Sequence, residues 1–283
     1  MKKRNWISLL LIMLCAAVLV GYRAWDRMHS DTETPEITME AQLPELSALE
    51  QRSALLQGVS ARDKRDGDVT GSLVVESVRL LRSDGTVTVT YAAFDKAGNV
   101  AKADREVRFH DYESPRFSLQ RPLLFSRNAG YDVLSIIRAE DMLDGNISHR
   151  IRATVLDEVD SDYAGTHDVQ FRVTNSLGET VELVLPVEVY TPSLFEGSLT
   201  LTDYLIYLKQ GDKFVANSYL DTFTLGRDEI SLRTGLTEEM RLLVSGKVET
   251  GVPGVYVVDY ELTYEKAEQL YTAYSRLIVV VEV

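Results

Sequence analysis

The sequence predicts an all-β protein with three tandem β-sandwich domains behind an N-terminal transmembrane helix. Three observations lead to this prediction. An uncharged apolar run lies within the first 25 residues, stretches beyond residue 36 alternate apolar and polar side chains, and one pattern recurs after about 80 residues. Alternation with period two puts successive side chains on opposite faces of a strand, and recurrence at a fixed spacing is typical of repeated domains.

Composition narrows the classes of function. The 283 residues include 30 Lys and Arg against 43 Asp and Glu, a net charge of -13, and residues 31–283 alone carry a net charge of -17. This charge argues against a nucleic-acid partner, because binding to the phosphate backbone needs a basic surface. The only cysteine is Cys15, which excludes an intrachain disulfide and a zinc site built from cysteines.

The N-terminal segment predicts a membrane anchor. Residues 2–4 are basic, and the 17 residues from Trp6 to Tyr22 carry no charge. As a helix this run spans about 25 Å, a little short of the ~30 Å hydrocarbon core of a bilayer. Trp6, Tyr22 and Trp25 lie near its ends, where amphipathic aromatic rings prefer the membrane interface.

Basic residues before an apolar run stay on the cytoplasmic side of a membrane. We therefore expect a single-pass protein of the cell membrane, with residues 1–5 inside, a signal anchor over 6–25, a polar stalk over 26–35 and an extracellular remainder. A cleaved secretory signal is one alternative, with Ala17 and Cys15 as small residues at the cleavage site. A lipoprotein signal at Cys15 is another, although Leu14 precedes it where a small residue is expected.

The repeat defines the domain organisation. Residues 59–78 match 137–156, with Asp63 and Asp141 offset by 78 residues, and residues 85–109 match 165–189 at an offset of 80. The second copy is therefore two residues longer, within the connection at 156–164. Domain 1 is expected over 36–111, domain 2 over 112–190, and a diverged domain 3 over 191–283.

Each copy reads as short strands. Residues 86–91 and 168–173 alternate apolar and polar side chains, and the turns at 96–99 and 176–179 predict hairpins. Residues 105–109 and 184–189 are expected to supply closing strands. In the last copy, strands are expected within 203–220, 251–264 and 275–283, whereas residues 265–274 fit either a hairpin tip or a helical turn.

The repeated motifs resemble the bacterial Ig-like domains that occur in tandem on Gram-positive surface proteins and in some pesticidal crystal proteins. They are Val-x-Ala-x-Asp-x-x-Asp-Gly-Asp-Val-Thr over 59–70, Gly-Thr-Val-Thr-Val-Thr-Tyr-x-x-x-Asp-x-x-Gly-Asn over 85–99 and Leu-x-Gln-Gly-Asp-x-Phe over 208–214. The resemblance covers about residues 36–283 and implies an Ig-like β-sandwich for each copy. It implies little about function, because such domains serve as spacers, stalks and binding modules alike.

The Asp-Gly turns hold the candidate metal ligands, and calcium is the only cofactor considered. Ca²⁺ takes several oxygen ligands, which carboxylates on a turn can supply, although the spacing is not that of an EF-hand. The same residues also fit a turn without metal, in which Asp side chains accept hydrogen bonds from nearby backbone N–H groups. The candidates are Asp63, Asp66, Asp68, Asp95, Asp141, Asp144, Asn146 and Asn175.

Tyrosines of the third copy form a candidate binding surface. Exposed tyrosines stack on sugars and anchor protein partners, but tyrosine also packs well across strands. The candidates are Tyr204, Tyr207, Tyr219, Tyr264, Tyr271 and Tyr274.

Catalysis is not expected. A glycosidase needs two carboxylates at a defined separation across a cleft, whereas these acids recur in duplicated turns, and no nucleophile motif accompanies the histidines. We expect a membrane-anchored extracellular protein that acts as a surface spacer or as an interaction module for cell-wall polysaccharide or another surface protein. The alternatives are an accessory subunit of a cell-envelope complex, in wall assembly or secretion, and a dedicated polysaccharide-binding module.

Overall fold

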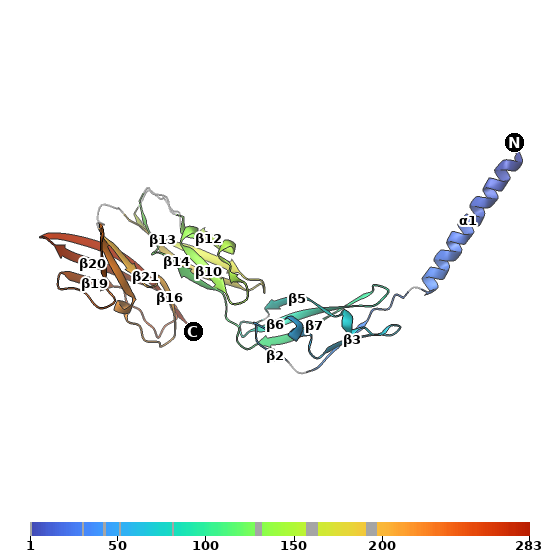
Figure 1. Cartoon of the computed structure of the whole chain (residues 1–283), viewed down its shortest axis with the longest axis horizontal. Helices are drawn as coiled ribbons and strands as arrows, with labels where there is room; N and C mark the ends of the chain where they lie inside the picture. The colour runs from blue at the N-terminus through green and yellow to red at the C-terminus, as the bar shows by residue number, and fades with distance from the viewer. Residues whose placement is uncertain are drawn as a thin grey trace. The chain divides into compact units, whose positions relative to one another are not determined.

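The computed structural model describes residues 2–29, 31–41, 44–50, 52–80, 82–127, 132–156, 164–190 and 197–283, and within helix α1 the side chains of Trp6 and residues 10–25. Contacts divide the chain into two compact units, Met1–Tyr112 and Glu113–Val283 (Figure 1). The predicted longer connection of the second copy lies mostly outside the described residues.

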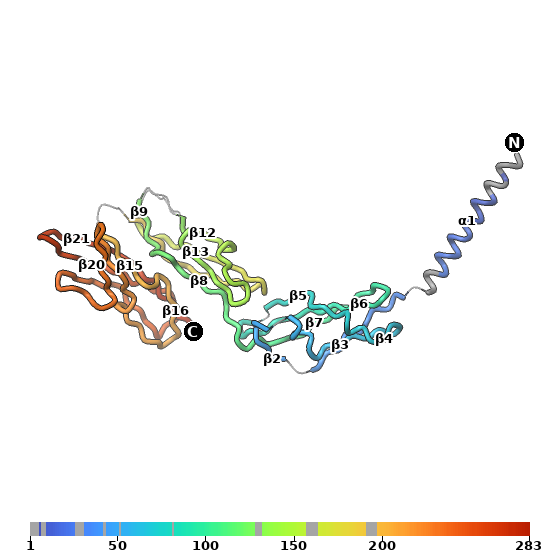
Figure 2. Tube along the Cα trace, viewed as in Figure 1, coloured from blue at the N-terminus to red at the C-terminus, as the bar shows by residue number. Residues whose placement is uncertain are grey.

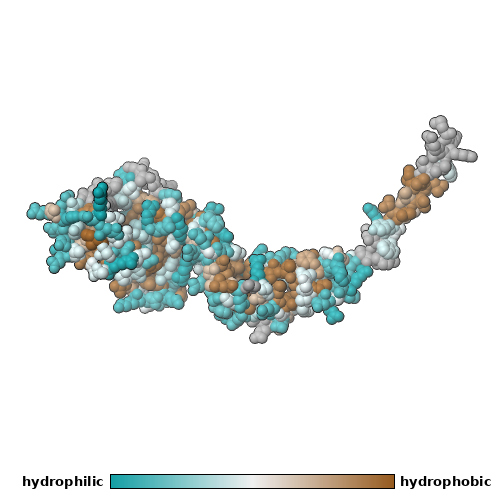
Figure 3. Space-filling model, viewed as in Figure 1, coloured by the Kyte–Doolittle hydropathy of each residue, from teal (hydrophilic) through white to brown (hydrophobic). Residues whose placement is uncertain are grey.

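The N-terminal segment forms helix α1 (Lys2–His29). Its side chains Trp6, Tyr22 and Trp25 are 75, 62 and 59% exposed, and its apolar middle is the brown band of Figure 3. Among the helices of the described residues, none has both the length and the apolar character needed to cross a bilayer. The transmembrane anchor therefore stays a prediction.

The all-β prediction is confirmed for the rest of the described chain. The strands of the first unit are β1 (Glu36–Met39), β2 (Glu45–Leu46), β3 (Val59–Asp63), β4 (Gly67–Asp68), β5 (Val74–Leu80), β6 (Thr86–Phe94) and β7 (Val100–Phe109). Those of the second unit are β8 (Arg116–Leu119), β9 (Leu124–Ser126), β10 (Ile137–Asp141), β11 (Gly145–Asn146), β12 (Arg152–Val155), β13 (Gly165–Thr174), β14 (Thr180–Tyr190), β15 (Ser198–Leu201), β16 (Leu205–Lys209), β17 (Leu220–Leu225), β18 (Asp228–Ser231), β19 (Met240–Ser245), β20 (Gly254–Lys266) and β21 (Gln269–Glu282). Short 3₁₀ helices are η1 (Arg52–Leu56), η2 (Thr70–Ser72), η3 (Val133–Ser135), η4 (Ser148–Arg150) and η6 (Ala216–Tyr219).

One topology occurs three times. Three-stranded sheets have the orders β1-β3-β4, β8-β10-β11 and β15-β17-β18, and four-stranded sheets have the orders β2-β7-β6-β5, β9-β14-β13-β12 and β16-β21-β20-β19. In each four-stranded sheet the edge strand β2, β9 or β16 is parallel to its neighbour. The third copy thus keeps the strand order of the other two, although residues 226–250 lack the Asp-x-x-Asp-Gly motif.

The sequence alternation explains the strands and their hairpins. In β13, Val169, Phe171 and Val173 are buried while the residues between them face outward. The predicted turns at 96–99 and 176–179 do separate β6 from β7 and β13 from β14. The closing strands expected at 105–109 and 184–189 are not separate elements, because each continues the second strand of its hairpin.

The third copy contains the longest hairpin, at the red end of the trace in Figure 2. Strands β20 and β21 pair in register from Gly254 with Val281 to Lys266 with Gln269. Residues 265–274 therefore form a hairpin tip and not a helical turn. Its two loop residues, Ala267 and Glu268, have positive φ angles of 49° and 62°, which suit the right-handed twist of a two-residue β-hairpin.

Two hydrophobic cores meet in the second unit. In β21, Leu277, Val279 and Val281 belong to the core of the third copy, whereas Ile278 and Val280 belong to the core of the second. The four-stranded sheet of the third copy is thus buried on both faces around β21. A strand covered on both faces reads as a continuous apolar run, which accounts for the sequence of residues 277–281.

Candidate functional site

The candidate metal ligands lie on turns built in the same way in the first two copies. The Oδ1 atom of Asp63 accepts hydrogen bonds from the N–H groups of Arg65 (2.7 Å) and Asp66 (2.8 Å). Asp141 does the same for Leu143 (2.9 Å) and Asp144 (2.8 Å). Each aspartate therefore holds the turn between β3 and β4 or between β10 and β11.

A second carboxylate in each copy ties this turn to the neighbouring hairpin turn. Asp66 Oδ2 accepts from Lys96 N at 2.8 Å, and Asp144 Oδ2 accepts from Ser176 N at 2.8 Å and from Arg150 at 2.6 Å. Burial opposes ionisation of Asp144, but the hydrogen bonds from Ser176 and Arg150 outweigh it and lower its pKa.

The third candidate position lies two residues before a short 3₁₀ helix and bonds to the first residue of that helix. Asp68 Oδ1 accepts from Thr70 N at 2.9 Å, and Asn146 Oδ1 accepts from Ser148 N at 3.0 Å. An aspartate and an asparagine can both make this contact, because it requires only one side-chain oxygen as hydrogen-bond acceptor. The geometry of Asp66, Asp68, Asp144 and Asn146 is thus that of hydrogen-bonded turns.

The two copies differ where the turn meets the following hairpin. In the second copy, Asn175 Nδ2 donates to Asp141 Oδ2 at 3.0 Å, and both residues are 5% exposed. In the first copy, Asp95 stands in the place of Asn175, and Asp63 and Asp95 are 2% and 8% exposed. Two buried carboxylates therefore face each other where the second copy has a carboxylate and an amide.

A third carboxylate joins this pair in the first copy. Asp31, Asp63 and Asp95 each place a carboxylate oxygen within 4.8 Å of the other two. We call this set the triple-aspartate cluster. Asp63 Oδ2 is buried and has no hydrogen-bond partner among the described residues.

The cluster has other contacts at its edge. Asp31 Oδ1 accepts from Glu33 N at 3.1 Å, and Arg65 lies 4.0 Å from Asp31 Oδ2. Asn99 donates its Nδ2 to Asp95 Oδ2 at 2.6 Å and to the carbonyl oxygen of Asp31 at 3.1 Å. Burial opposes ionisation of Asp95, but hydrogen bonds from the side chain and backbone of Asn99 help to lower its pKa.

Asp31 is the residue that the sequence reasoning missed. It was assigned to the stalk, because residues 26–35 are polar and acidic. Strand β1 follows it and pairs with β3 from Glu36 with Arg62 to Met39 with Val59. A strand expected at 36–39 and paired beside 59–63 would have signalled that Asp31 lies close to Asp63.

The tyrosines of the candidate binding surface are all half-buried. Tyr219 stacks on Phe214 with ring centroids 5.9 Å apart, and Tyr264 meets Phe223 edge-on at 5.5 Å. Tyr271 lies opposite Tyr264 in the β20–β21 hairpin and donates a hydrogen bond to Gln269 Oε1 at 3.0 Å.

The other three tyrosines lie toward the second copy. Tyr204 contacts both cores of the second unit. The Tyr207 hydroxyl accepts from Phe117 N at 3.1 Å, the Arg116 guanidinium lies 4.9 Å from its ring centroid, and burial raises its pKa to about 12. Tyr274 lines a cavity of about 350 Å³ between strands of the two copies, together with Glu188 and Arg276. A binding role for the six tyrosines stays a prediction.

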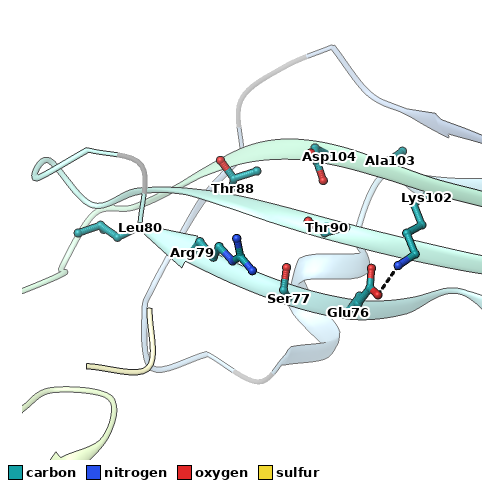
Figure 4. A pocket seen from close by; sticks show the side chains of 9 residues that line it. All are labelled: Glu76, Ser77, Arg79, Leu80, Thr88, Thr90, Lys102, Ala103 and Asp104. Carbon is teal, nitrogen blue, oxygen red and sulfur yellow. Dashed lines mark hydrogen bonds and ion pairs between the residues drawn. The ribbon is translucent and has the colours of Figure 1, made fainter. Parts of the chain in front are cut away.

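The first unit also carries an open polar hollow on the outer face of strands β5, β6 and β7 (Figure 4). Its volume is about 820 Å³. Lys102 Nζ donates to Glu76 Oε1 at 2.5 Å across the strands, and Arg79 and Asp104 contribute further charges of both signs. The hollow therefore has no single charge that would select a ligand.

Three similar solved structures share little sequence with this chain. A protocadherin GammaB4 extracellular domain is 10% identical over 87% of this chain and 49% of its own, with a TM-score of 0.19. The CBM51-2 and INT domains of ZmpB from Clostridium perfringens are 15% identical over 60% of this chain and 42% of their own, with a TM-score of 0.27. A lipoprotein of Bacteroides thetaiotaomicron is 11% identical over 56% of this chain and 77% of its own, with a TM-score of 0.24.

The chain thus spans less than half the length of the first two structures. No protein-family model matches the sequence, and no curated protein does. At such low TM-scores these likenesses carry no argument about function. The strand pairing and the hydrophobic cores of this chain are what show its tandem β-sandwiches.

Proposed function

We propose that the protein is a membrane-anchored extracellular module of tandem Ig-like sandwiches that acts without catalysis, by binding a partner at the cell surface. The observation that supports this proposal is the shared packing within residues 113–283. Leu205, Ile278 and Val280 of the third copy are 6, 0 and 9% exposed and lie in the core of the second copy. The two copies therefore hold one fixed geometry.

Polar contacts reinforce this joint. Arg116 pairs with Glu282 at 3.1 Å, and Arg276 bonds both Asp259 of its own sheet and Glu188 of the second copy. A spacer needs only reach, which linked domains provide with few contacts between them. A large apolar joint instead fixes two sandwiches as one body, and a fixed body presents a composite surface to a ligand at low entropic cost.

The experiment distinguishes a module that binds a partner from a spacer that only provides length. Full-length protein is expressed in its own host, beside a variant in which residues 113–283 are replaced by two unrelated sandwiches of similar length. Both are tested for binding to purified cell-wall polysaccharide and for cross-linking to surface proteins. We expect the full-length protein to bind the polysaccharide or to cross-link to a surface protein, and we expect the replacement variant to do neither.

The alternatives predict other results. A spacer would function equally well after the replacement, since only the reach is needed. An accessory subunit of an envelope complex would lose its function when α1 is exchanged for an unrelated apolar helix. A dedicated polysaccharide-binding module would sediment with purified wall material without cross-linking to surface proteins, and substitution of Tyr219 and Tyr271 by alanine would weaken that sedimentation.

A further inference from the structure

The triple-aspartate cluster combines two features that are costly without a cation. Three carboxylates lie within 4.8 Å of one another, and like charges at this distance disfavour ionisation of the group. In addition, Asp63 Oδ2 is buried in a side chain that is only 2% exposed, and it has no hydrogen-bond partner among the described residues. An unpaired buried oxygen costs the full desolvation penalty of that atom.

We propose that Asp31, Asp63 and Asp95 bind one Ca²⁺ ion. Carboxylate oxygens suit hard cations, and ligands of one Ca²⁺ at 2.3–2.6 Å lie up to about 5 Å apart, which matches the observed 4.8 Å. The ion gives Asp63 Oδ2 its missing partner and cancels most of the repulsion. Water completes the coordination, because Ca²⁺ takes six to eight oxygen ligands.

The second copy is an internal control for this assignment. There, Asn175 satisfies Asp141 Oδ2 through its amide, so no cation is needed. Glu36 pairs with Arg62 in the first copy, and Arg116 pairs with Glu140 in the second. Because Arg62 and Glu140 are equivalent positions of the repeat, Arg116 is the counterpart of Glu36. The same offset of 80 residues makes Asp111 the counterpart of Asp31, and Asp111 instead accepts from Ser47 Oγ (2.6 Å) and Ala48 N (2.7 Å).

The site would attach the segment after α1 to the first sandwich. Asp31 lies two residues beyond the last residue of α1, His29, whereas Asp63 ends β3 and Asp95 follows β6. Calcium would therefore order the connection at residues 31–35 against β3 and the β6–β7 turn. Few carboxylates and much water predict the weak affinity of an extracellular site, with a Kd of roughly 0.1–1 mM.

The experiment uses the purified full chain in detergent micelles, stripped with EDTA and then melted in 5 mM CaCl₂ or in EDTA. We expect calcium to raise the melting temperature of the first unit by about 5 °C. Hydrogen exchange should slow at Asp31 and at the 63–66 and 95–99 turns and should not change in residues 113–283. An unchanged melting temperature, or a larger shift with MgCl₂ than with CaCl₂, would overturn the proposal.

The decisive variant is Asp95→Asn, which gives the first copy the amide of the second. It should abolish the calcium response, because one carboxylate ligand is lost and the new amide can donate to Asp63. In EDTA it should melt close to the wild type, because Asp63 gains a partner while the Asn99 amide, which donates to Asp95 Oδ2 in the wild type, loses its acceptor. A variant that folds and still responds to calcium would overturn the proposal. Asp31→Asn should also lose the response, whereas Asp66→Asn, an identical change on the same turn as Asp63 but outside the cluster, should retain it.

Discussion

Arg276 shows how single residues hold the second unit together. It is 7% exposed, its Nε donates to Asp259 Oδ1 at 2.6 Å, and its guanidinium also bonds Glu188. Burial alone would lower the pKa of Arg276, but the hydrogen bonds and charges of Asp259 and Glu188 outweigh this and raise it. The planar guanidinium can serve both carboxylates at once, which the ammonium of a lysine cannot do with the same geometry.

Removal of this guanidinium should therefore destabilise the second unit. We expect Arg276→Ala to reduce the free energy of unfolding by about 2 kcal/mol, because two carboxylates lose a charge-assisted partner. Urea denaturation of the full chain measures this loss. Arg172→Ala is the matched control, since Arg172 pairs with Glu182 on the surface and such pairs contribute about 0.2–1 kcal/mol. Equal losses in both variants would contradict this role of Arg276.

The turn aspartates make a prediction about pH. The pKa of Asp144 is lowered from 3.8 in the folded chain, so its contribution to stability is present above about pH 4 and disappears as the pH falls through the folded value. We expect Asp144→Asn to flatten the fall of the melting temperature below about pH 4. A melting curve that falls as steeply in this variant as in the wild type would show that other groups control the acid response.

Residues of the turns differ in how far the sequence determines their contacts. The recurrence of Asp-x-x-Asp-Gly suffices to predict the bonds of Asp63 and Asp141 to nearby N–H groups, because these bonds are local. The contact of Asp63 with Asp95 is not local, and their spacing in the sequence does not reveal it. Asp31 was harder still, because its acidic neighbours resemble a solvated stalk.

The β20–β21 hairpin is the element with the clearest strain. Ala267 and Glu268 both adopt positive φ, which costs non-glycine residues about 1–2 kcal/mol each. Replacement by Asn-Gly, the preferred pair for such a turn, should relieve this strain. We expect Ala267→Asn with Glu268→Gly to slow hydrogen exchange of the amides near Tyr264 and Tyr271 about fivefold.

The control for this turn is a glycine placed elsewhere in the same hairpin. Leu270→Gly, two residues after the turn residue Glu268, should accelerate exchange because glycine weakens a strand. If the Asn-Gly variant also exchanges faster than the wild type, the positive φ angles do not limit the stability of the hairpin.

At the scale of elements, the alternation of apolar and polar residues predicts where strands lie. It does not predict how far each strand continues. The alternation at 86–91 and 168–173 indicates strands directly, whereas nothing local shows that residues 100–109 form a single strand. The apolar run at 277–281 is expected in a closing strand, and it lies in β21, the second strand of the long hairpin. Both faces of this run are buried because one of them packs against the second copy. The sequence of the strand alone does not reveal this packing.

For the whole molecule, the joint between the second and third copies predicts shared stability. Tyr207 of the third copy accepts a hydrogen bond from Phe117 N of the second, so Tyr207→Phe leaves that N–H without this partner at a cost of about 1–2 kcal/mol. Because the cores adjoin, we expect amides around Phe171 and Tyr260 to lose hydrogen-exchange protection equally. Tyr271→Phe, at the hairpin tip, is the control and should change neither. Loss confined to one copy would show that the two sandwiches unfold independently.

The location of Ile278 and Val280 has a consequence for the order in which the chain can fold. The core of the second sandwich uses side chains that lie 91 and 93 positions beyond Val187, the last residue that β14 contributes to this core. At 5–20 residues per second, ribosomes need roughly 5–20 s to add them. During that interval the second sandwich presents an unfinished apolar surface, which makes this stretch of the nascent chain a target for chaperones.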